Sequence, residues 1–322
     1  MDNACAFKQS FFKLATMKLL GNILLLVSMT CSASAYAIAQ DDDESINCGK
    51  CVEWNQPQQP FNLYGNTWYV GTSELSSVLI TGPHGHILLD GDLPQSAKLI
   101  ENNIRALGFR VEDIKLIVNS HAHYDHAGGI AALQRASGAK VAASASSAQT
   151  LKDGMIGNDD PQYSSSWRKM PKLHAVPIKI VTDGETVKIG ELAVTAHMTP
   201  GHTPGSTTWT WQSCDGGRCL DIVYADSLNA ASNDVFYYSG DATHPDISAQ
   251  FRASIAKVAA LKCDVIVSVH PDFTDTMDKL AKKTATNNPF IYPNGCREYA
   301  ADGDAALTKR LEREKDEKAA AK

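Results

Sequence analysis

Short apolar runs bounded by turn residues predict strands in the region 63–89, where residues 82–85 would form a hairpin turn. Apolar residues at helical spacing then predict a helix over 95–107, and Gly108 stands where a C-cap glycine belongs. Polar residues with weak periodicity over 154–176 predict a long surface loop of the kind that often borders a site. Between these segments the pattern predicts a buried strand at 114–118, a helix at 128–137 and a strand at 140–143.

The second half of the chain repeats this order, with strands first and then a helix and a further strand. Apolar residues on one face predict a helix over 247–261, and the apolar run 265–269 predicts a buried strand. Helices that cover the outer faces of two packed sheets would bury both sets of apolar strands. The pattern therefore predicts an α/β fold, a four-layer αββα sandwich. The other strands of this half are predicted at 178–181, 186–196, 206–212 and 220–225.

The first 39 residues have the features of a secretory signal peptide. Lys13 and Lys18 precede a short apolar run, 19–29, and small residues follow it up to Ala39. The run is too short for a membrane helix, which takes about 20 apolar residues. We therefore expect an exported protein, periplasmic or secreted, that has no contact with the membrane after cleavage.

Cleavage near Ala39 would leave an N-terminal arm, 40–62, and one domain, 63–322. The tail of that domain is charged and helix-prone from Ala305, and we interpret it as a solvated terminal helix. The formal net charge of -6 gives no basic surface for nucleic acid, and the composition is that of a soluble globular enzyme. We expect a monomer.

The cysteines also fit an exported protein. Of the eight, Cys5 and Cys31 fall in the predicted signal peptide, and the even number that remains favours disulfides in an oxidising compartment. Cys48 and Cys51 have a spacing that would also suit a zinc or redox site. Because no second pair has zinc-finger spacing and no βαβ pattern surrounds them, we favour a structural cystine or a pair without a role.

Candidate chemistry is concentrated directly after the predicted strand 114–118. His121 and His123 are two residues apart, so an extended backbone would place them on the same side. A turn would bring Asp125 and His126 toward a neighbouring point. Imidazole and carboxylate groups are preferred zinc ligands, so the segment predicts a zinc site at the end of a strand.

Two more histidines follow predicted strands. His202 lies in a loop rich in glycine and proline, and His270 follows the apolar strand that ends at Val269. Each alone would be an ordinary histidine, but beside the first cluster each is interpreted as completing a metal site. The remaining histidines have no ligand partners nearby in sequence and are interpreted as ordinary residues: His84, His86, His174, His197 and His244.

This pattern resembles the metallo-beta-lactamase superfamily, over essentially the whole chain from Tyr64 to Arg297. The segments 65–72, 201–207 and 224–228 are similar to the third subclass of zinc beta-lactamases. The resemblance implies an αββα fold, two zinc ions and an extracytoplasmic enzyme. It also implies disulfides that pair Cys214 with Cys219 and Cys263 with Cys296, whereas the family's partner for a cysteine in the arm is absent here.

The resemblance also implies roles for single residues. Asp125 would bind the second zinc and orient the attacking hydroxide, which makes it the candidate catalytic residue. Ser227 and Asn229 would bind the substrate, although relatives often have serine or threonine at the position of Asn229. The zinc ligands would be His121, His123 and His202 for the first ion, and Asp125, His126 and His270 for the second.

We therefore expect hydrolysis of the amide bond of beta-lactams, with penicillins, cephalosporins and carbapenems as small-molecule substrates. Two zinc ions can share one hydroxide as the nucleophile. The alternative is another hydrolase of the same fold, a lactonase or a glyoxalase-II-like thioesterase, in which an aspartate bridges the metals; Asp226 could be that residue. A zinc-binding protein without catalysis is disfavoured by the complete set of ligands for two metals.

Overall fold

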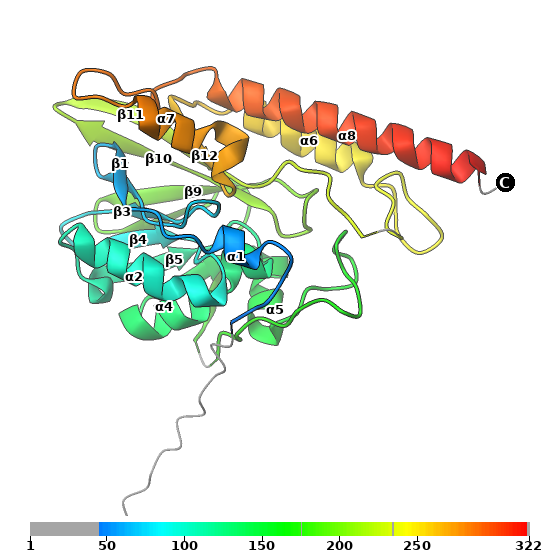
Figure 1. Cartoon of the computed structure of the whole chain (residues 1–322), viewed down its shortest axis with the longest axis horizontal. Coiled ribbons are helices and arrows are strands. Elements are labelled where there is room, and N and C mark those ends of the chain that lie inside the picture. The colour runs from blue at the N-terminus through cyan, green and yellow to red at the C-terminus, as the bar shows by residue number, and fades with distance from the viewer. Residues whose placement is uncertain (1–44, 175, 234, 321–322) are drawn as a thin grey trace, which may run out of the picture. The chain divides into compact units, whose positions relative to one another are not determined.

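Two β-sheets pack face to face between layers of helices (Figure 1). The computed structural model describes residues 45–320, except 175 and 234. Its architecture confirms the predicted αββα sandwich. The predicted signal peptide, 1–39, lies outside the described residues and stays a prediction.

The first sheet follows the order of the sequence. Its strands pair antiparallel up to the fourth and parallel from there onward. The seven strands are β1 (Phe61–Tyr64), β2 (Thr67–Tyr69), β3 (Val78–Ile80), β4 (His86–Leu89), β5 (Ile114–Val118), β6 (Lys140–Ala143) and β7 (Ile178–Ile180).

The second sheet has five strands in the order β12-β11-β10-β9-β8, and only β11 and β12 pair parallel. Their bounds are β8 (Thr186–Ile189), β9 (Leu192–Met198), β10 (Thr207–Asp215), β11 (Arg218–Ala225) and β12 (Val265–Ser268). The facing sides of the two sheets form one buried core that contains Tyr69, Leu89, Trp209 and Tyr224. This core sets the distance between the strand ends of the two sheets.

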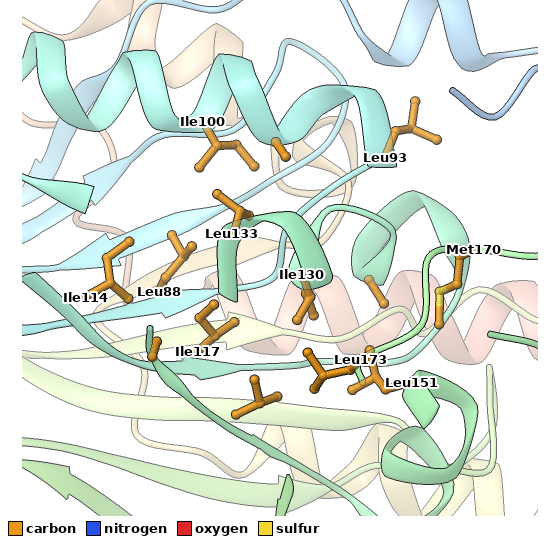
Figure 2. Close-up of a cluster of buried hydrophobic side chains, with 14 of the residues drawn as sticks. Leu88, Leu93, Ile100, Ile114, Ile117, Ile130, Leu133, Leu151, Met170 and Leu173 are labelled. Carbon is orange, nitrogen blue, oxygen red and sulfur yellow. The ribbon is translucent and has the colours of Figure 1, made fainter. Parts of the chain in front are cut away.

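Helices cover the outer face of each sheet. Against the first sheet, Ile100 and Leu133 meet Leu88 and Ile117 in a buried cluster (Figure 2). The long helices are α2 (Ala97–Ala106), α4 (Ile130–Ser137) and α5 (Ala145–Asp153) on the first sheet, and α6 (Ser248–Ala259) and α8 (Gly295–Ala320) on the second. Short helices are α1 (Cys51–Trp54), α3 (Tyr124–Ala127) and α7 (Thr276–Lys282). Among the described residues, the structure contains no helix that is both long and apolar enough to cross a membrane.

Two sequence predictions are wrong in detail. Residues 186–196 form a hairpin instead of one strand, because Gly190 adopts φ +56° and turns the chain between β8 and β9. The C-terminal helix begins at Gly295, and it is not fully solvated: Leu307 and Glu314 have no exposed surface. Because the tail is rich in charged residues, its sequence does not indicate that one face of the helix is buried.

Three disulfides lie among the described residues. Cys214 pairs with Cys219 across the β10–β11 hairpin, and Cys263 pairs with Cys296 at the start of α8, as the resemblance implies. Cys48 and Cys51 pair with each other, in agreement with a structural cystine. The bridge to Cys296 therefore ties α8 to the segment that leads into β12.

We expect the long-range disulfide to contribute most to stability. Cys263 and Cys296 are 33 residues apart, whereas Cys214 and Cys219 are 5 apart. In the chain-entropy model, loops of these lengths correspond to about 4 and about 2 kcal/mol of unfolding free energy. Denaturant unfolding of the two double alanine variants at metal saturation measures the difference, and equal losses would contradict the expectation.

Candidate metal centre

The six predicted ligand residues come together where strands of both sheets end. All six are buried or nearly buried. Their positions follow from the strand ends: β5 leads into His121 and His123, β9 into His202 and β12 into His270, while α3 carries Asp125 and His126. The arrangement is rigid because buried strands place most of the ligands.

The ligand residues form two neighbouring groups. Within each group the candidate ligand atoms all lie within 4.8 Å of one another. The ring centroids of His121 and His126, one from each group, are 4.5 Å apart. The first group is His121, His123 and His202, and the second is Asp125, His126 and His270. The other five histidines lie outside both groups.

Asp90 fixes the backbone that enters the site. Its Oδ1 accepts hydrogen bonds from Nδ2 of Asn119 (2.9 Å) and from the backbone N of Ser120 (2.8 Å). Its Oδ2 accepts from the hydroxyls of Ser120 and Tyr224. Burial raises the pKa of Asp90 to about 7, although these hydrogen bonds oppose the shift. The residues just before His121 are thus held by a fully buried carboxyl group.

Two histidines of the first group are oriented by carboxylates. Nδ1 of His121 lies 2.6 Å from Oδ1 of Asp226, and Nε2 of His123 lies 3.0 Å from Oδ2 of Asp160. Both aspartates are buried. Burial lowers the pKa of His123, but the Asp160 carboxylate outweighs it and the net shift is upward. A carboxylate behind a metal-binding histidine fixes the ring orientation and increases its basicity.

Backbone carbonyl groups orient two further histidines. Nδ1 of His202 donates to the carbonyl oxygen of Asn229 (2.8 Å). Nδ1 of His270 donates to the carbonyl oxygen of Glu74 (3.2 Å). Each of these rings keeps its second nitrogen for the centre of its group. Four of the five histidines therefore have an outer partner, which is the pattern of metal-binding histidines.

The inner nitrogens suit a metal ion. Nε2 of His121 is buried and has no hydrogen-bond partner. Burial, followed by repulsion from His126 and His123, lowers the pKa of His121 well below its ordinary value. Burial also lowers the pKa of His202 to about 3. These rings are neutral at pH 7, and the neutral form is the one that binds metal.

Asp125 supplies the only carboxylate of the six residues. Its Oδ2 lies 3.2 Å from Nε2 of His126 and 3.5 Å from Nε2 of His270. Burial would raise the pKa of Asp125, but these two histidines lower it well below its usual range. The group is therefore ionised and faces the second set of ligand atoms.

The predicted loop 154–176 lies against the centre and contains no helix or strand among its described residues. Trp167 packs against His123, with ring centroids 5.1 Å apart. Nε2 of Gln162 lies 3.4 Å from Nε2 of His202. Figure 2 shows Met170 and Leu173, near the end of the loop, in the buried cluster under the first sheet. The loop is thus part of the candidate site, and Asp160 within it is a candidate functional residue that the sequence pattern does not indicate.

The two predicted substrate-binding residues lie beside the first group. Ser227 is 1% exposed, and its hydroxyl accepts a hydrogen bond from the backbone N of Asn229 (3.3 Å). The side chain of Asn229 is exposed and borders a cavity of about 360 Å³ with Phe273 and Tyr299. Asn229 therefore contributes its carbonyl group to His202 and its side chain to a cavity.

A model of the metallo-beta-lactamase superfamily matches residues 71–270, which include both ligand groups. The chain belongs to this superfamily. Among solved structures it is similar to the Rm3 metallo-beta-lactamase, with 49% identity, a TM-score of 0.80, and coverage of 84% of this chain and 100% of that one. It is also similar to MEM-A1, a subclass B3 metallo-beta-lactamase from a soil metagenome library, with 47% identity, a TM-score of 0.79, and coverage of 82% and 99%.

A curated relative carries a different name. The hydroxyacylglutathione hydrolase of Acidiphilium cryptum (strain JF-5) is 24% identical over 208 residues, which are 65% of this chain and 69% of that protein. The superfamily match and the solved relatives confirm the predicted family and fold, and that the chain is a hydrolase of the metallo-beta-lactamase kind. Because the solved relatives are beta-lactamases and the curated relative is a hydroxyacylglutathione hydrolase, membership of the family does not by itself identify the substrate.

We expect Asp226→Asn to weaken zinc binding. The substitution keeps the side-chain size but removes the charge that faces Nδ1 of His121. Outer partners of this kind contribute roughly 10- to 100-fold to metal affinity. Competition with a chromophoric chelator measures the change. Asp221→Asn, which changes a residue of β11 that bonds to Gln212, is the control; equal affinities in the two variants would show that Asp226 does not support His121.

Proposed function

We propose that this protein hydrolyses the amide bond of beta-lactams, with penicillins, cephalosporins and carbapenems as substrates. The observation that carries the proposal is the pair of adjacent ligand groups at the strand ends. The similarity of the whole fold to the two solved metallo-beta-lactamases supports it. Because one fold can serve many reactions, the residues of the site decide the reaction.

The residues of the site fit two zinc ions. Imidazole nitrogens and a carboxylate oxygen are preferred zinc ligands, and the unpartnered Nε2 of His121 is available for one. Zinc ions held by these residues would supply an activated water at neutral pH and a Lewis acid for the substrate carbonyl. His121, His123 and His202 would hold the first ion, and Asp125, His126 and His270 the second.

Asp125 is the residue that we assign to catalysis. Its carboxylate is ionised, so it can accept a hydrogen bond from the attacking water and orient it toward the carbonyl carbon. Hydrolysis by an activated water needs no covalent enzyme intermediate. The hydroxyl of Ser227 therefore has no role as a nucleophile in this proposal.

We assign Ser227 and Asn229 to substrate binding. Common beta-lactams carry a carboxylate near the ring nitrogen, and a serine hydroxyl can donate a hydrogen bond to it. Gln162 and Trp167 of the loop 154–176 would border the same substrate, because they lie against His202 and His123. These contacts would hold the lactam carbonyl beside both ligand groups.

Export agrees with this function. The signal peptide expected over residues 1–39 would carry the chain to the periplasm or the medium, where beta-lactams act. Three disulfides suit an oxidising compartment. We propose a soluble monomer that acts on small molecules and confers resistance to these antibiotics.

The similarity to a hydroxyacylglutathione hydrolase favours a second candidate, a thioesterase of the same fold. In that branch of the family an aspartate bridges the two metals, and Asp226 is the candidate for that role. In this structure Asp226 instead bonds to Nδ1 of His121 and belongs to neither ligand group. This position favours the beta-lactamase proposal.

Metal analysis tests the ligand assignment. We expect about two zinc ions per chain, loss of activity after dialysis against a chelator, and recovery when zinc is added. His202→Ala and His270→Ala should each lower the zinc content to about one, because each removes a ligand of one group. His197→Ala changes a histidine that bonds to Thr210 and should keep the parent content. Full activity of metal-free protein would refute the assignment.

A substrate panel tests the proposed reaction. We expect kcat/KM to be high for a penicillin, a cephalosporin and a carbapenem. An acyl-homoserine lactone and a glutathione thioester should be hydrolysed far more slowly, because neither presents a beta-lactam carbonyl with a neighbouring carboxylate. If either control substrate is turned over faster than all three beta-lactams, the protein is a lactonase or thioesterase of the same fold.

A further inference from the structure

We propose that Glu314 of helix α8 is a positioning residue for the first ligand group. It acts through residues 233–240 and then through the loop 154–176, in which Asp160 contacts His123. The inference rests on the proposed metal binding and is independent of the substrate. Helix α8 lies outside residues 71–270, the part of the chain that matches the superfamily model.

Glu314 is a fully buried carboxylate in a helix rich in exposed charges. Its Oε1 accepts hydrogen bonds from the backbone N of Tyr238 (2.8 Å) and from Nε of Arg310 (2.7 Å). Its Oε2 accepts from the backbone N (2.9 Å) and the hydroxyl (2.7 Å) of Ser239. A buried carboxylate with four donors fixes the groups around it, because loss of any donor leaves charge unpaired.

Arg310 extends the hold of Glu314 to the next residues of the same loop. Its Nη2 donates to the carbonyl oxygen of Phe236 (2.7 Å). Lys318, one turn further along α8, donates from Nζ to the hydroxyl of Ser239 (2.7 Å) and to the carbonyl oxygen of Gly240 (2.6 Å). One face of the C-terminal helix therefore clamps residues 236–240.

Asn233 joins the clamped segment to the loop over the metal centre. Its Oδ1 accepts from the backbone N of Phe236 (2.8 Å). Its backbone N donates to the carbonyl oxygen of Pro161 (2.9 Å), and its Nδ2 donates to the carbonyl oxygen of Tyr163. Pro161 and Tyr163 are thus tied to the segment that α8 holds.

Residues 159–163 of the loop alternate between a cavity on one side and the ligand histidines on the other. Asp159, Pro161 and Tyr163 border a cavity of about 540 Å³ together with Phe236. Asp160 and Gln162, between them, contact His123 and His202. The hydrogen bonds from Asn233 hold the backbone directly after Asp160 and on both sides of Gln162. Every step from Glu314 to His123 is therefore a hydrogen bond or a short stretch of the same backbone.

The helix also holds the backbone next to Ser227, which is a separate contact of α8. The hydroxyl of Tyr299 donates to the carbonyl oxygen of Asp226 (2.8 Å) and accepts from the backbone N of Leu228 (3.1 Å). Glu314 does not touch this segment. Loss of Glu314 should therefore affect the contact of Asp160 with His123 and leave the backbone around Ser227 in place.

The test measures zinc affinity of each group separately. In a His270→Ala background only the first group keeps three ligands, and in a His202→Ala background only the second does. Glu314→Gln should weaken zinc binding by about 10-fold in the first background, the low end of the effect of residues that bond a ligand directly. It should leave the affinity unchanged in the second background.

Two further variants separate positioning from general stability. Glu317→Gln, on the same helix, changes an exposed residue that pairs with Arg313 and should have no effect in either background. In an Asp160→Ala background, Glu314→Gln should have no additional effect, because its route to His123 is already broken. Equal weakening of both groups, or a full effect without Asp160, would overturn the proposal.

If Glu314→Gln does not fold, Asn233→Ala tests the same route from the other side. It removes the side-chain bonds to Phe236 and Tyr163 without changing α8. We expect the same loss in the first group alone. Unchanged zinc affinity in this variant would overturn the proposal, and failure of both single-group backgrounds to bind zinc would instead refute the metal assignment itself.

Discussion

The metal centre depends on one constraint: a buried imidazole has two nitrogens, and each requires a partner. In this protein one nitrogen of each ligand histidine faces the centre of its group. The other nitrogen points outward and needs a hydrogen-bond acceptor from a neighbouring segment. Asp226, Asp160 and the carbonyl groups of Asn229 and Glu74 meet that requirement for four of the five histidines, with Nδ1 of His126 as the exception. Segments far apart in the chain must therefore reach one point, and the two packed sheets supply the frame that brings them there.

That the six residues come together could be predicted from the sequence, because most of them follow a strand and the strand ends of a sandwich meet at its edges. The outer partners leave a weaker signal. Asp160 lies in a loop without periodicity, 37 residues from His123. The carbonyl groups of Glu74 and Asn229 belong to the backbone, which every residue has, so no side-chain pattern can mark them. The sequence indicates Asp226 only as the metal-bridging aspartate of the alternative function, because its contact with the outer nitrogen of His121 depends on the packing of β11.

The C-terminal helix shows a different limit of sequence analysis. Charged residues are almost always exposed, so a tail rich in lysine and glutamate predicts a solvated helix. Glu314 is an exception because Arg310, one turn earlier, and the backbone of Tyr238 and Ser239 satisfy it. Arg310 lies at the i,i+4 spacing of ordinary exposed helix pairs, and Tyr238 and Ser239 belong to a distant part of the chain, so neither marks a buried carboxylate in the sequence. The buried face becomes visible only when the fold brings the loop against the helix.

The disulfide between Cys263 and Cys296 has a consequence for the order of maturation. It connects the segment that precedes β12, and hence His270, to the first turn of α8. Reducing conditions in the cytosol do not maintain such a bond. Under the proposed export, the last helix would be held only by packing and hydrogen bonds until the chain reaches an oxidising compartment. The covalent attachment of this helix would then follow transport of the chain.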